Sequence, residues 1–528
     1  MLDRVGVDKV RENRSARDVT RATWADLLDW KVDKESGVPI YQQVADFLRG
    51  KIASGAIPPG SRLPSSRQLL NKLGVSRTTI ITAYSQLLAD GYIEGQIGSG
   101  TYVAHDAVNL IDAGALPELD ESGLGRTRGL SRRGRDYQSI QIDRLVMENV
   151  PFNVGTVRVD GRTSAQWRQI AVRKLTIDPS QLGYIDPVGD VNLRREVAKY
   201  LSAARGARCT PEQIILVAGT QQATDLAIRV LLDPGDQVWV EDPAYPLTAI
   251  ALEAAGMSLV PVPVDHEGLD VSKGIKSAPK ARAAFVTPSH QYPLGVALSL
   301  QRRADLLAWA LKNDAWVIED DYDSEFRYGG AALPALRALD TGNRVIYTGS
   351  FSKVMFPGLR YGYMVVPLAL VNAFAAARMI SDRHPPIFFG SVLAEFMQRG
   401  YFVSHIRRMR NEYQRARDVL VAQLQRHVGG IVDVSTPNQG MHLIVYLPDG
   451  WSDEQVAAEA REQGVVVRPI SRLYRCSRPR PGLMLGFAGF DQHRLRSAAS
   501  SLARVIERFQ ASQGSAGKDA GNRTGNSA

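Results

Sequence analysis

Four side chains that can do chemistry lie close together in the string YTGSFSKVMFPGLRYGY, which follows the strand-like run RVIY. They are Lys353, Ser350, Ser352 and Arg360. A lysine amine can form a Schiff base with an aldehyde, while hydroxyls and a guanidinium can hold a phosphate dianion. For Lys353 in isolation, a loop lysine followed by a surface arginine is the better interpretation. The hypothesis of a cofactor lysine therefore depends on other parts of the sequence.

A second group of such residues lies in VIEDDYDSEF, where a hydrophobic strand runs into acids 33 residues before Lys353. Parallel α/β sheets present functional groups where their strands end. The carboxylate of Asp320 beside a pyridine nitrogen would keep that nitrogen protonated, and the Tyr322 phenol can hydrogen-bond a ring hydroxyl. The alternative is a cluster of helix-capping acids, with Asp321 and Asp323 as examples.

A third group surrounds the turn in ILVAGTQQATDLAIRVLLDPGD, which predicts a strand, a tight glycine turn and an amphipathic helix. Free amides at Gly219, Thr220 and Gln221 would open a helix N-terminus toward an anion. Many strand-to-helix turns contain glycine, so this string alone is weak support. In EDPAYP, Tyr245 can stack on a cofactor ring or lie in the core.

Together these strings resemble the fold type I aminotransferase family across roughly Gln181 to Phe487. The resemblance implies pyridoxal 5′-phosphate as cofactor, with Lys353 as the Schiff-base lysine, Asp320 at the pyridine nitrogen and Tyr322 at the ring hydroxyl. It also implies a set of residues at the phosphate and one on the ring: Gly219, Thr220, Gln221, Ser350, Ser352 and Arg360, with Tyr245 on the ring. Tyr184 matches the tyrosine that reaches the neighbouring subunit's cofactor in this family, so a homodimer is implied.

Two positions depart from the family pattern. TPSHQYPLGV places Tyr292 where these aminotransferases usually carry asparagine, and PGLMLGFAGF places Met484 where an arginine usually binds the substrate carboxylate. A methionine cannot pair with a carboxylate. Arg468, Arg472 and Arg475 can supply that charge from another direction. The sequence therefore leaves turnover of ordinary α-amino acids unsupported.

The elements before residue 104 predict a separate helical module. The stretch YQQVADFLRGKIASGAI places Val44, Phe47, Leu48 and Ile52 on one helical face. The stretch LPSSRQLLNKLGVSRTTIITAYSQLLADGYI then predicts two capped helices joined at Gly74. YIEGQIGSGTYVA predicts two short strands that form a β-hairpin wing.

Two helices joined by a short turn form a helix-turn-helix, in which the early residues of the second helix face the DNA groove. Residues 38–103 resemble the winged helix-turn-helix domain of GntR-type transcription regulators. The arrangement and the resemblance together imply these DNA contacts: Arg67, Ser76, Arg77, Thr78, Thr79 and Gly100. The alternative is a small helical domain used only for protein contacts.

The chain has 528 residues, which is too long for a single core. Strand-like runs and helical stretches alternate after about residue 151, which predicts an α/β domain with a mostly parallel sheet. We expect an N-terminal extension (1–37), the winged helix-turn-helix (38–103), a linker (104–147), the pyridoxal-phosphate-binding domain (148–510) and a disordered tail (511–528). The linker holds five arginines between Arg126 and Arg135.

Composition narrows the class of protein. Hydrophobic residues at 44% and charged residues at 23% are typical of globular chains, and the formal charge of +9 favours a polyanionic partner only weakly. We expect no transmembrane helix, no signal peptide and no metal site, and with Cys209 and Cys476 as the two cysteines we expect a cytoplasmic protein.

A GntR-like module and an aminotransferase-like domain on one chain resemble the MocR subfamily of transcription regulators, including the strings TPSHQ and EDDYDSEF. The resemblance implies a homodimer that binds promoter DNA and senses pyridoxal phosphate, or an amino compound that reacts with it, with at most weak transamination. The alternative is a catalytic aminotransferase with an accessory DNA-binding module. Substantial turnover would favour the enzyme, whereas specific DNA binding without turnover would favour the regulator. The sequence does not select the effector, the target genes or the direction of regulation.

Overall fold

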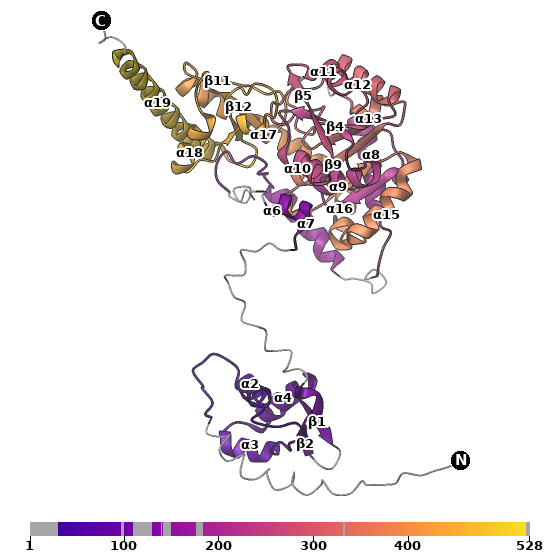
Figure 1. Cartoon of the computed structure of the whole chain (residues 1–528), viewed down its shortest axis with the longest axis vertical. Coiled ribbons are helices and arrows are strands. Elements are labelled where there is room, and N and C mark those ends of the chain that lie inside the picture. The colour runs from indigo at the N-terminus through magenta and orange to yellow at the C-terminus, as the bar shows by residue number, and fades with distance from the viewer. Residues whose placement is uncertain are drawn as a thin grey trace. The chain divides into compact units, whose positions relative to one another are not determined.

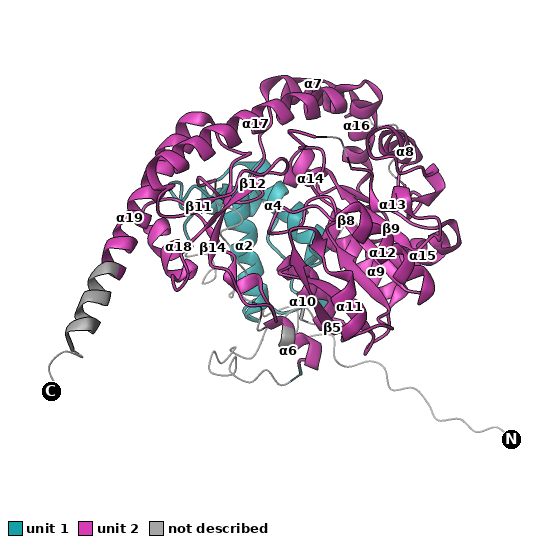
Figure 2. Cartoon of the chain, turned by 90° about the horizontal axis from the view of Figure 1, so that it is seen from above, with its two compact units in different colours: residues 1–129 teal, residues 130–528 magenta. Residues whose placement is uncertain are grey.

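The computed structural model describes residues 30–96, 100–108, 129–138, 140, 149–175, 183–330 and 333–523. The chain forms two compact units, Met1–Gly129 and Leu130–Ala528 (Figure 2). Each unit has its own buried hydrophobic side chains and is described by itself below.

The described residues of unit 1 form three α-helices, a short 3-10 helix (His105–Val108) and a two-stranded antiparallel sheet. Figure 1 labels its α-helices and strands. Its elements are α2 (Ile40–Ala53), α3 (Ser66–Leu73), α4 (Arg77–Ala89), β1 (Ile93–Gln96) and β2 (Gly100–Val103). Val44, Leu48 and Ile52 of the predicted apolar face are buried, and Phe47 stacks on Trp30 with ring centroids 4.7 Å apart. The three helices therefore enclose one small core.

The sequence predicts the ends of α3 in unit 1. The Ser65 hydroxyl accepts from the Gln68 amide at 3.4 Å while the Gln68 side chain accepts from the Ser65 amide at 2.9 Å. Gly74 ends the helix with φ 64°, in the left-handed region that favours glycine. Both the capping box and the glycine turn were predicted.

The wing of unit 1 has a further edge that the sequence does not reveal. The Leu63 amide donates to the Thr101 carbonyl at 2.8 Å, and Arg62 forms an isolated β-bridge with Tyr102. The segment after the Pro58-Pro59-Gly60 break thus pairs with β2 and fastens the wing to the helices.

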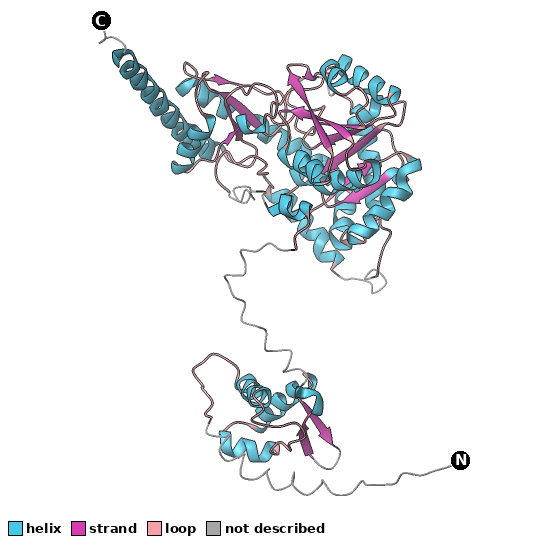
Figure 3. Cartoon of the chain, viewed as in Figure 1, coloured by secondary structure: helices cyan, strands magenta, loops and turns pink. Residues whose placement is uncertain are grey.

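The main sheet of unit 2 has eight strands in the order β3-β10-β9-β8-β7-β4-β5-β6. Figure 3 shows strands in magenta and helices in cyan. Neighbours from β9 through β5 pair in parallel, whereas β10 and β6 pair antiparallel. The strands are β3 (Ile214–Val217), β4 (Gln237–Asp242), β5 (Ser258–Asp265), β6 (Gly268–Leu269), β7 (Ala283–Val286), β8 (Trp316–Asp321), β9 (Val345–Ser350) and β10 (Gly362–Val365). This confirms the predicted α/β fold with a mostly parallel sheet.

Helices cover both faces of this sheet, because alternate strand residues enter different cores. Ile215 and Val217 of β3 pack with α9 and α15, whereas Ile214 and Leu216 pack with α8 and α16. The helices of unit 2 up to α17 are α6 (Arg132–Gln138), α7 (Gly161–Lys174), α8 (Val191–Arg205), α9 (Thr220–Leu231), α10 (Pro246–Ala254), α11 (Val271–Ser277), α12 (Leu300–Lys312), α13 (Leu336–Leu339), α14 (Phe351–Val354), α15 (Val371–Asp382), α16 (Ile387–Gln398) and α17 (Tyr401–Val428).

A second sheet of four antiparallel strands has the order β11-β12-β14-β13. Its strands are β11 (Asp433–Val434), β12 (His442–Tyr446), β13 (Arg468–Pro469) and β14 (Gly482–Gly486), and its helices α18 (Asp453–Glu462) and α19 (Gln492–Arg523) pack on it together with α17. Asp242, at the end of β4, accepts the amides of Arg475, Cys476 and Ser477 at 2.6–3.1 Å. These hydrogen bonds join the second sheet's loop to the first sheet.

Two predicted boundaries differ from the structure. Helix α19 continues to Arg523, so the disordered tail expected from 511 is helical over 511–523, because extending an anchored helix costs much less than starting one. The predicted linker contains α6, and its residues 109–128 and 141–147 lie outside the described residues, as do 524–528 and most of the predicted N-terminal extension.

Every helix among the described residues is too short or too polar to span a lipid bilayer. In the same part of the chain, His, Cys, Asp and Glu side chains form no group of three or more that could hold a metal ion.

Candidate functional site

Lys353 lies in the short helix α14, directly after strand β9. The Ser350 hydroxyl begins that helix by accepting from the Ser352 amide at 3.1 Å. A β carbon placed on Gly155, which has φ 90°, would collide with Lys353 Nζ. The chain before α7 therefore passes directly over the lysine amine, which only glycine permits at this point.

Asp320 lies near the carboxyl end of β8, on the sheet face covered by α9. The side chains of its neighbours Glu319 and Asp321 lie on the opposite face of the sheet. Glu319 accepts hydrogen bonds there from the Leu336 and Arg337 amides at 2.7 and 2.8 Å, and Asp321 forms an ion pair with Arg205 at 2.8 Å. Asp320 Oδ1 is buried and has no hydrogen-bond partner in the described part of the chain. A buried carboxylate oxygen of this kind is costly unless a donor reaches it.

The charges around Asp320 and Lys353 shift both pKa values. Burial raises the pKa of Asp320 to about 7, and the carboxylates of Asp321, Asp323 and Glu241 add to the effect. Burial also lowers the pKa of the half-buried Lys353, while Asp323 and Asp320 oppose the shift. A lowered lysine pKa increases the share of neutral amine, which is the nucleophilic form.

Three tyrosines line the same region. The Tyr245 and Tyr292 rings lie edge to face with centroids 5.3 Å apart, and the Tyr292 and Tyr322 centroids are 6.4 Å apart. Burial raises the pKa of Tyr245 to about 12, with Tyr292 and Asp320 contributing. Tyr292 therefore neighbours both Tyr245 and Tyr322, and the charge of Asp320 acts on these two tyrosines.

The predicted phosphate residues come from three separate turns. Gly219 begins α9 with φ 123°, and within the described chain no side chain caps this helix N-terminus. A β carbon on Gly219 would lie 3.8 Å from Arg360 Nη1, and Ser350 pairs with Gly362, whose own β carbon would lie 3.0 Å from Gly219 Cα. The structure thus brings Gly219, Ser350 and Arg360 together at a helix N-terminus, an arrangement suited to an anion.

The other predicted phosphate residues are less directly placed. Thr220 and Gln221 are the first two residues of α9, so their amides belong to the same helix end. The Gln221 side chain donates to the Leu247 carbonyl at 3.4 Å. The Ser352 backbone amide donates a hydrogen bond to the Ser350 hydroxyl at 3.1 Å, which places Ser352 beside the other predicted phosphate residues.

Tyr184 lies apart from this cluster in the single chain. Its side chain is 77% exposed, the Arg383 guanidinium lies 4.2 Å from its ring centroid, and the His384 ring packs against it. These contacts lead toward the surface and not toward Lys353.

Of the three arginines considered as replacements for the missing one at Met484, only Arg468 acts on the site. Arg468 lies directly opposite the buried Met484 in the β13–β14 pair, and its charge lowers the pKa of Lys353. Arg472 pairs with Glu454 at 2.6 Å and Arg475 with Glu253 at 2.6 Å, at the surface. Arg468 is therefore the one of these three arginines whose charge reaches Lys353 in the described part of the chain.

The sequence analysis gives no role in the site to three buried residues: His290, which contacts Tyr322; Asp323, which binds His290; and His442, which packs against His290. The alternative that Asp321 and Asp323 cap a helix is wrong, because both are buried and bind the side chains of Arg205 and His290. The signal for His290 was present in the string TPSHQ, but only the fold shows that this loop meets the end of β8.

In unit 1, the predicted DNA residues divide into two groups. Ser76 accepts the Thr79 amide at 3.1 Å and so caps α4, whereas Arg77 and Thr78 are exposed in its first turn, and Arg67 is exposed on α3. Gly100 has φ 121°, and a β carbon there would lie 2.9 Å from Arg62 Nε. Arg62 is therefore a further exposed cation at the wing, which the sequence analysis missed.

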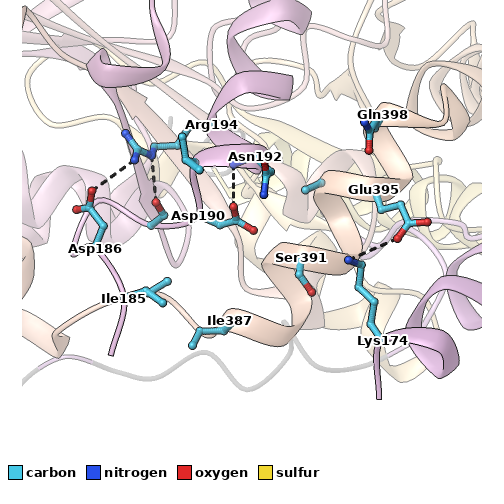
Figure 4. Close-up of a pocket in the computed structure, with 13 residues that line it drawn as sticks. Lys174, Ile185, Asp186, Asp190, Asn192, Arg194, Ile387, Ser391, Glu395 and Gln398 are labelled. Atoms are coloured by element: carbon cyan, nitrogen blue, oxygen red, sulfur yellow. Dashed lines mark hydrogen bonds and ion pairs between the residues drawn. The ribbon is translucent and has the colours of Figure 1, made fainter. Parts of the chain in front are cut away.

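A separate cavity of about 590 Å³ lies between α7, α8 and α16 (Figure 4). Its charged lining residues pair with one another: Arg194 with Asp186 at 3.4 Å and Lys174 with Glu395 at 3.5 Å. None of the predicted cofactor residues lines it. The cavity is therefore distinct from the Lys353 site.

These folds and sites define a class of protein: a winged helix-turn-helix domain joined to an aminotransferase-like domain that carries a lysine of lowered pKa, a buried carboxylate and an uncapped helix N-terminus at the ends of its sheet strands.

Known proteins agree with this class. The family model of bacterial regulatory proteins of the gntR family matches residues 40–103, and that of aminotransferases of class I and II matches residues 148–502. The probable rhizopine catabolism regulatory protein MocR of Rhizobium meliloti is 36% identical over 91% of this chain and 96% of its own. The pyridoxine biosynthesis regulator PdxR of Corynebacterium glutamicum is 31% identical over 88% of this chain and 95% of its own.

Among solved structures, the α-aminoadipate aminotransferase LysN of Thermus thermophilus, complexed with N-(5′-phosphopyridoxyl)-L-leucine, covers 72% of this chain and 98% of its own, with a TM-score of 0.64 and 27% identity. The chain belongs to the MocR subfamily of GntR-type transcription regulators. The predicted family and regulatory function are thereby confirmed.

Proposed function

We propose that this regulator binds pyridoxal 5′-phosphate at Lys353 and changes its DNA affinity when an amino compound reacts there. The observation that carries the proposal is Asp320 Oδ1, a buried carboxylate oxygen without a partner in the described chain, beside a lysine of lowered pKa. A protonated pyridine nitrogen would supply the missing donor.

The other residues fit the same cofactor. The α9 N-terminus at Gly219, Thr220 and Gln221, with Ser350, Ser352 and Arg360, would hold the phosphate. Tyr245 would contact the ring and Tyr322 its hydroxyl. When bound, the cofactor supplies an aldehyde that captures primary amines and a ring that accepts electrons.

Arg468 narrows the class of effector. Its charge reaches Lys353 from β13, while the opposite position on β14 carries the apolar Met484. We infer an effector with a primary amine and an anionic group, bound from the β13 side. At most weak transamination accompanies this binding, because the carboxylate would approach from a different strand than in an aminotransferase. A catalytic aminotransferase with an accessory DNA-binding module is the second candidate, and the aminotransferase-like fold favours it.

We propose DNA contacts from Arg67, Arg77 and Thr78, with Ser76 and Thr79 shaping the helix end and Gly100 the wing. We also propose a homodimer in which the exposed Tyr184 reaches the partner's cofactor. A ligand that prefers one arrangement of the DNA-binding units then shifts operator affinity by its differential binding alone.

The test uses purified full-length protein and the DNA upstream of its own gene, with scrambled DNA as competitor. Visible absorbance after addition of pyridoxal phosphate, lost in Lys353→Ala, and ligand-dependent DNA binding are the expected results. Transamination of an amino donor and a keto acid, lost in Lys353→Ala and without specific DNA binding, would favour the enzyme. No cofactor absorbance would contradict the proposal.

A further inference from the structure

Tyr322 belongs to a buried chain of hydrogen-bonding groups. Tyr322 Oη lies 3.0 Å from His290 Nδ1, and this nitrogen lies 3.0 and 2.9 Å from the two carboxylate oxygens of Asp323. The His290 and Asp323 side chains are each 1% exposed. Water therefore does not compete for these contacts.

The hydrogens available on these three side chains determine which group donates and which accepts in each hydrogen bond. An ionised carboxylate only accepts, so Asp323 requires the Nδ1 hydrogen of His290. A nitrogen that carries this hydrogen cannot accept a second one from Tyr322. The Tyr322 oxygen can at most share the Nδ1 hydrogen as an acceptor, and its own hydrogen is left to point elsewhere.

Glycines and a second histidine hold the His290 ring in this orientation. A β carbon on Gly295 would lie 3.2 Å from His290 Nε2, and one on Gly440 would collide with the ring. The His442 ring centroid lies 5.2 Å away, and His442 Nε2 donates to the Pro293 carbonyl at 2.9 Å. Burial lowers the pKa of His442 to about 3, so this neighbour is uncharged.

We propose that Asp323 and His290 are positioning residues that direct the Tyr322 hydroxyl hydrogen onto the ring hydroxyl oxygen of the bound cofactor. The proposal rests on the proposed function, because it requires pyridoxal phosphate on Lys353. Its consequence is that His290 helps to set the pH at which the Schiff-base nitrogen loses its proton.

The direction of the shift in midpoint pH follows from the proton that the ring oxygen shares with the Schiff-base nitrogen. A hydrogen bond from Tyr322 withdraws charge from the ring oxygen, which then holds the proton of the Schiff-base nitrogen less strongly. The hydrogen bonds from Asp323 through His290 to Tyr322 therefore lower the midpoint pH of the cofactor's absorbance change, and their loss raises it.

Other ionisable groups around the chain are accounted for. Tyr322 itself stays protonated, because burial raises its pKa well above the ordinary value. Tyr292 lies across from Tyr322, Asp320 and Glu241 act on Tyr322 through their charges, and Arg468 acts on Lys353. None of these groups is altered in the variants below, so a shift of the midpoint pH is due to the loss of the hydrogen bonds among Asp323, His290 and Tyr322.

The experiment titrates the absorbance of the cofactor-loaded full-length protein against pH. We expect His290→Leu and Tyr322→Phe each to raise the midpoint by about one pH unit, the size of a lost charge-assisted hydrogen bond. His290→Asn, whose amide nitrogen takes the place of Nδ1 and still donates, should stay near the wild-type midpoint. The double variant His290→Leu/Tyr322→Phe should match Tyr322→Phe alone.

An unchanged midpoint in His290→Leu, or fully additive shifts in the double variant, would overturn the proposal. If His290→Leu does not fold, His290→Met replaces it: its side chain has no hydrogen to donate, the charge of Asp323 that acts on Lys353 is kept, and the midpoint should again rise. Wild-type protein that shows no cofactor absorbance would contradict the proposed function instead. The two failures are thus distinguishable.

Discussion

At the scale of single residues, Asp320 shows how a strand serves two environments. Asp320 lies on the sheet face covered by α9, while its neighbours in the sequence lie on the opposite face, where two amides and an arginine bind them. Three consecutive acids are tolerated because each lies on the face that suits its partner. The unpaired oxygen is the member left for a ligand.

Asp320→Asn should weaken pyridoxal phosphate binding about 10- to 100-fold, the usual worth of a hydrogen bond to a charged group. Fluorescence titration of the apoprotein measures this dissociation constant. Asp433→Asn is the matched control, since Asp433 is an exposed acid that pairs with Arg480 at 3.0 Å. Equal affinity in Asp320→Asn and wild type would contradict the assigned role.

Glu241 makes stability depend on pH. Burial raises its pKa to about 7, although Thr287 and Gln291 donate to it. A carboxyl group with a raised folded-state pKa stabilises the fold fully below its unfolded-state pKa, and this stabilisation is lost as pH rises through about 7.

Glu241→Gln does not ionise, so its melting temperature should rise relative to that of the wild type between pH 5 and pH 8. Thermal unfolding of the two apoproteins over this range measures the difference. A melting temperature of Glu241→Gln that stays constant or falls relative to the wild type over this range would show that Glu241 is not the titrating group.

At the scale of elements, the parallel strands could be predicted because burial on both faces leaves continuous apolar runs. The three cofactor strings lie at the ends of such strands or the starts of helices, so their meeting in one cleft followed from the fold class. The pairing of His290 with Asp323 could not be predicted, because the loop that carries His290 has no periodic pattern. The same holds for the β-bridge between Arg62 and Tyr102 and for the effect of the Arg468 charge on Lys353.

At the start of α4, different residues serve the stability of unit 1 and the proposed binding of DNA. Ser76→Ala removes a helix cap and should destabilise unit 1 by about 1 kcal/mol. Arg77→Ala should leave its stability unchanged and weaken operator binding about tenfold or more. Thermal unfolding and titration of fluorescent operator DNA measure the two effects.

Arg229→Ala is the control for lost charge, since Arg229 is an exposed arginine of α9 that pairs with Asp225 at 2.8 Å. Operator affinity that Arg77→Ala leaves at the wild-type value would show that α4 is not the recognition helix.

At the scale of the whole molecule, a homodimer with shared sites makes a prediction about mixtures. Lys353→Ala removes the cofactor lysine and Tyr184→Ala the tyrosine supplied to the partner, so each homodimer has two impaired sites. In a mixed dimer, one site carries both changes and the other carries neither. Mixing the two variants under conditions that exchange subunits should restore tight cofactor binding at up to one site per mixed dimer.

Absorbance of the bound cofactor measures the restored sites. Mixtures that bind no more cofactor than the separate variants would contradict shared sites, and the same mixture at a concentration where the protein is monomeric serves as the control.

The alternation of Glu319, Asp320 and Asp321 along β8 also restricts which insertions and deletions the sequence can accept. A shift of this strand by one residue would turn Asp321 into the cleft and Asp320 toward Arg205, exchanging a ligand group for a structural ion pair. A single-residue insertion or deletion within β8, before Glu319, would therefore move every acid to the wrong side. Selection should eliminate such insertions and deletions in the strand far more strongly than changes of length in the loop that precedes it.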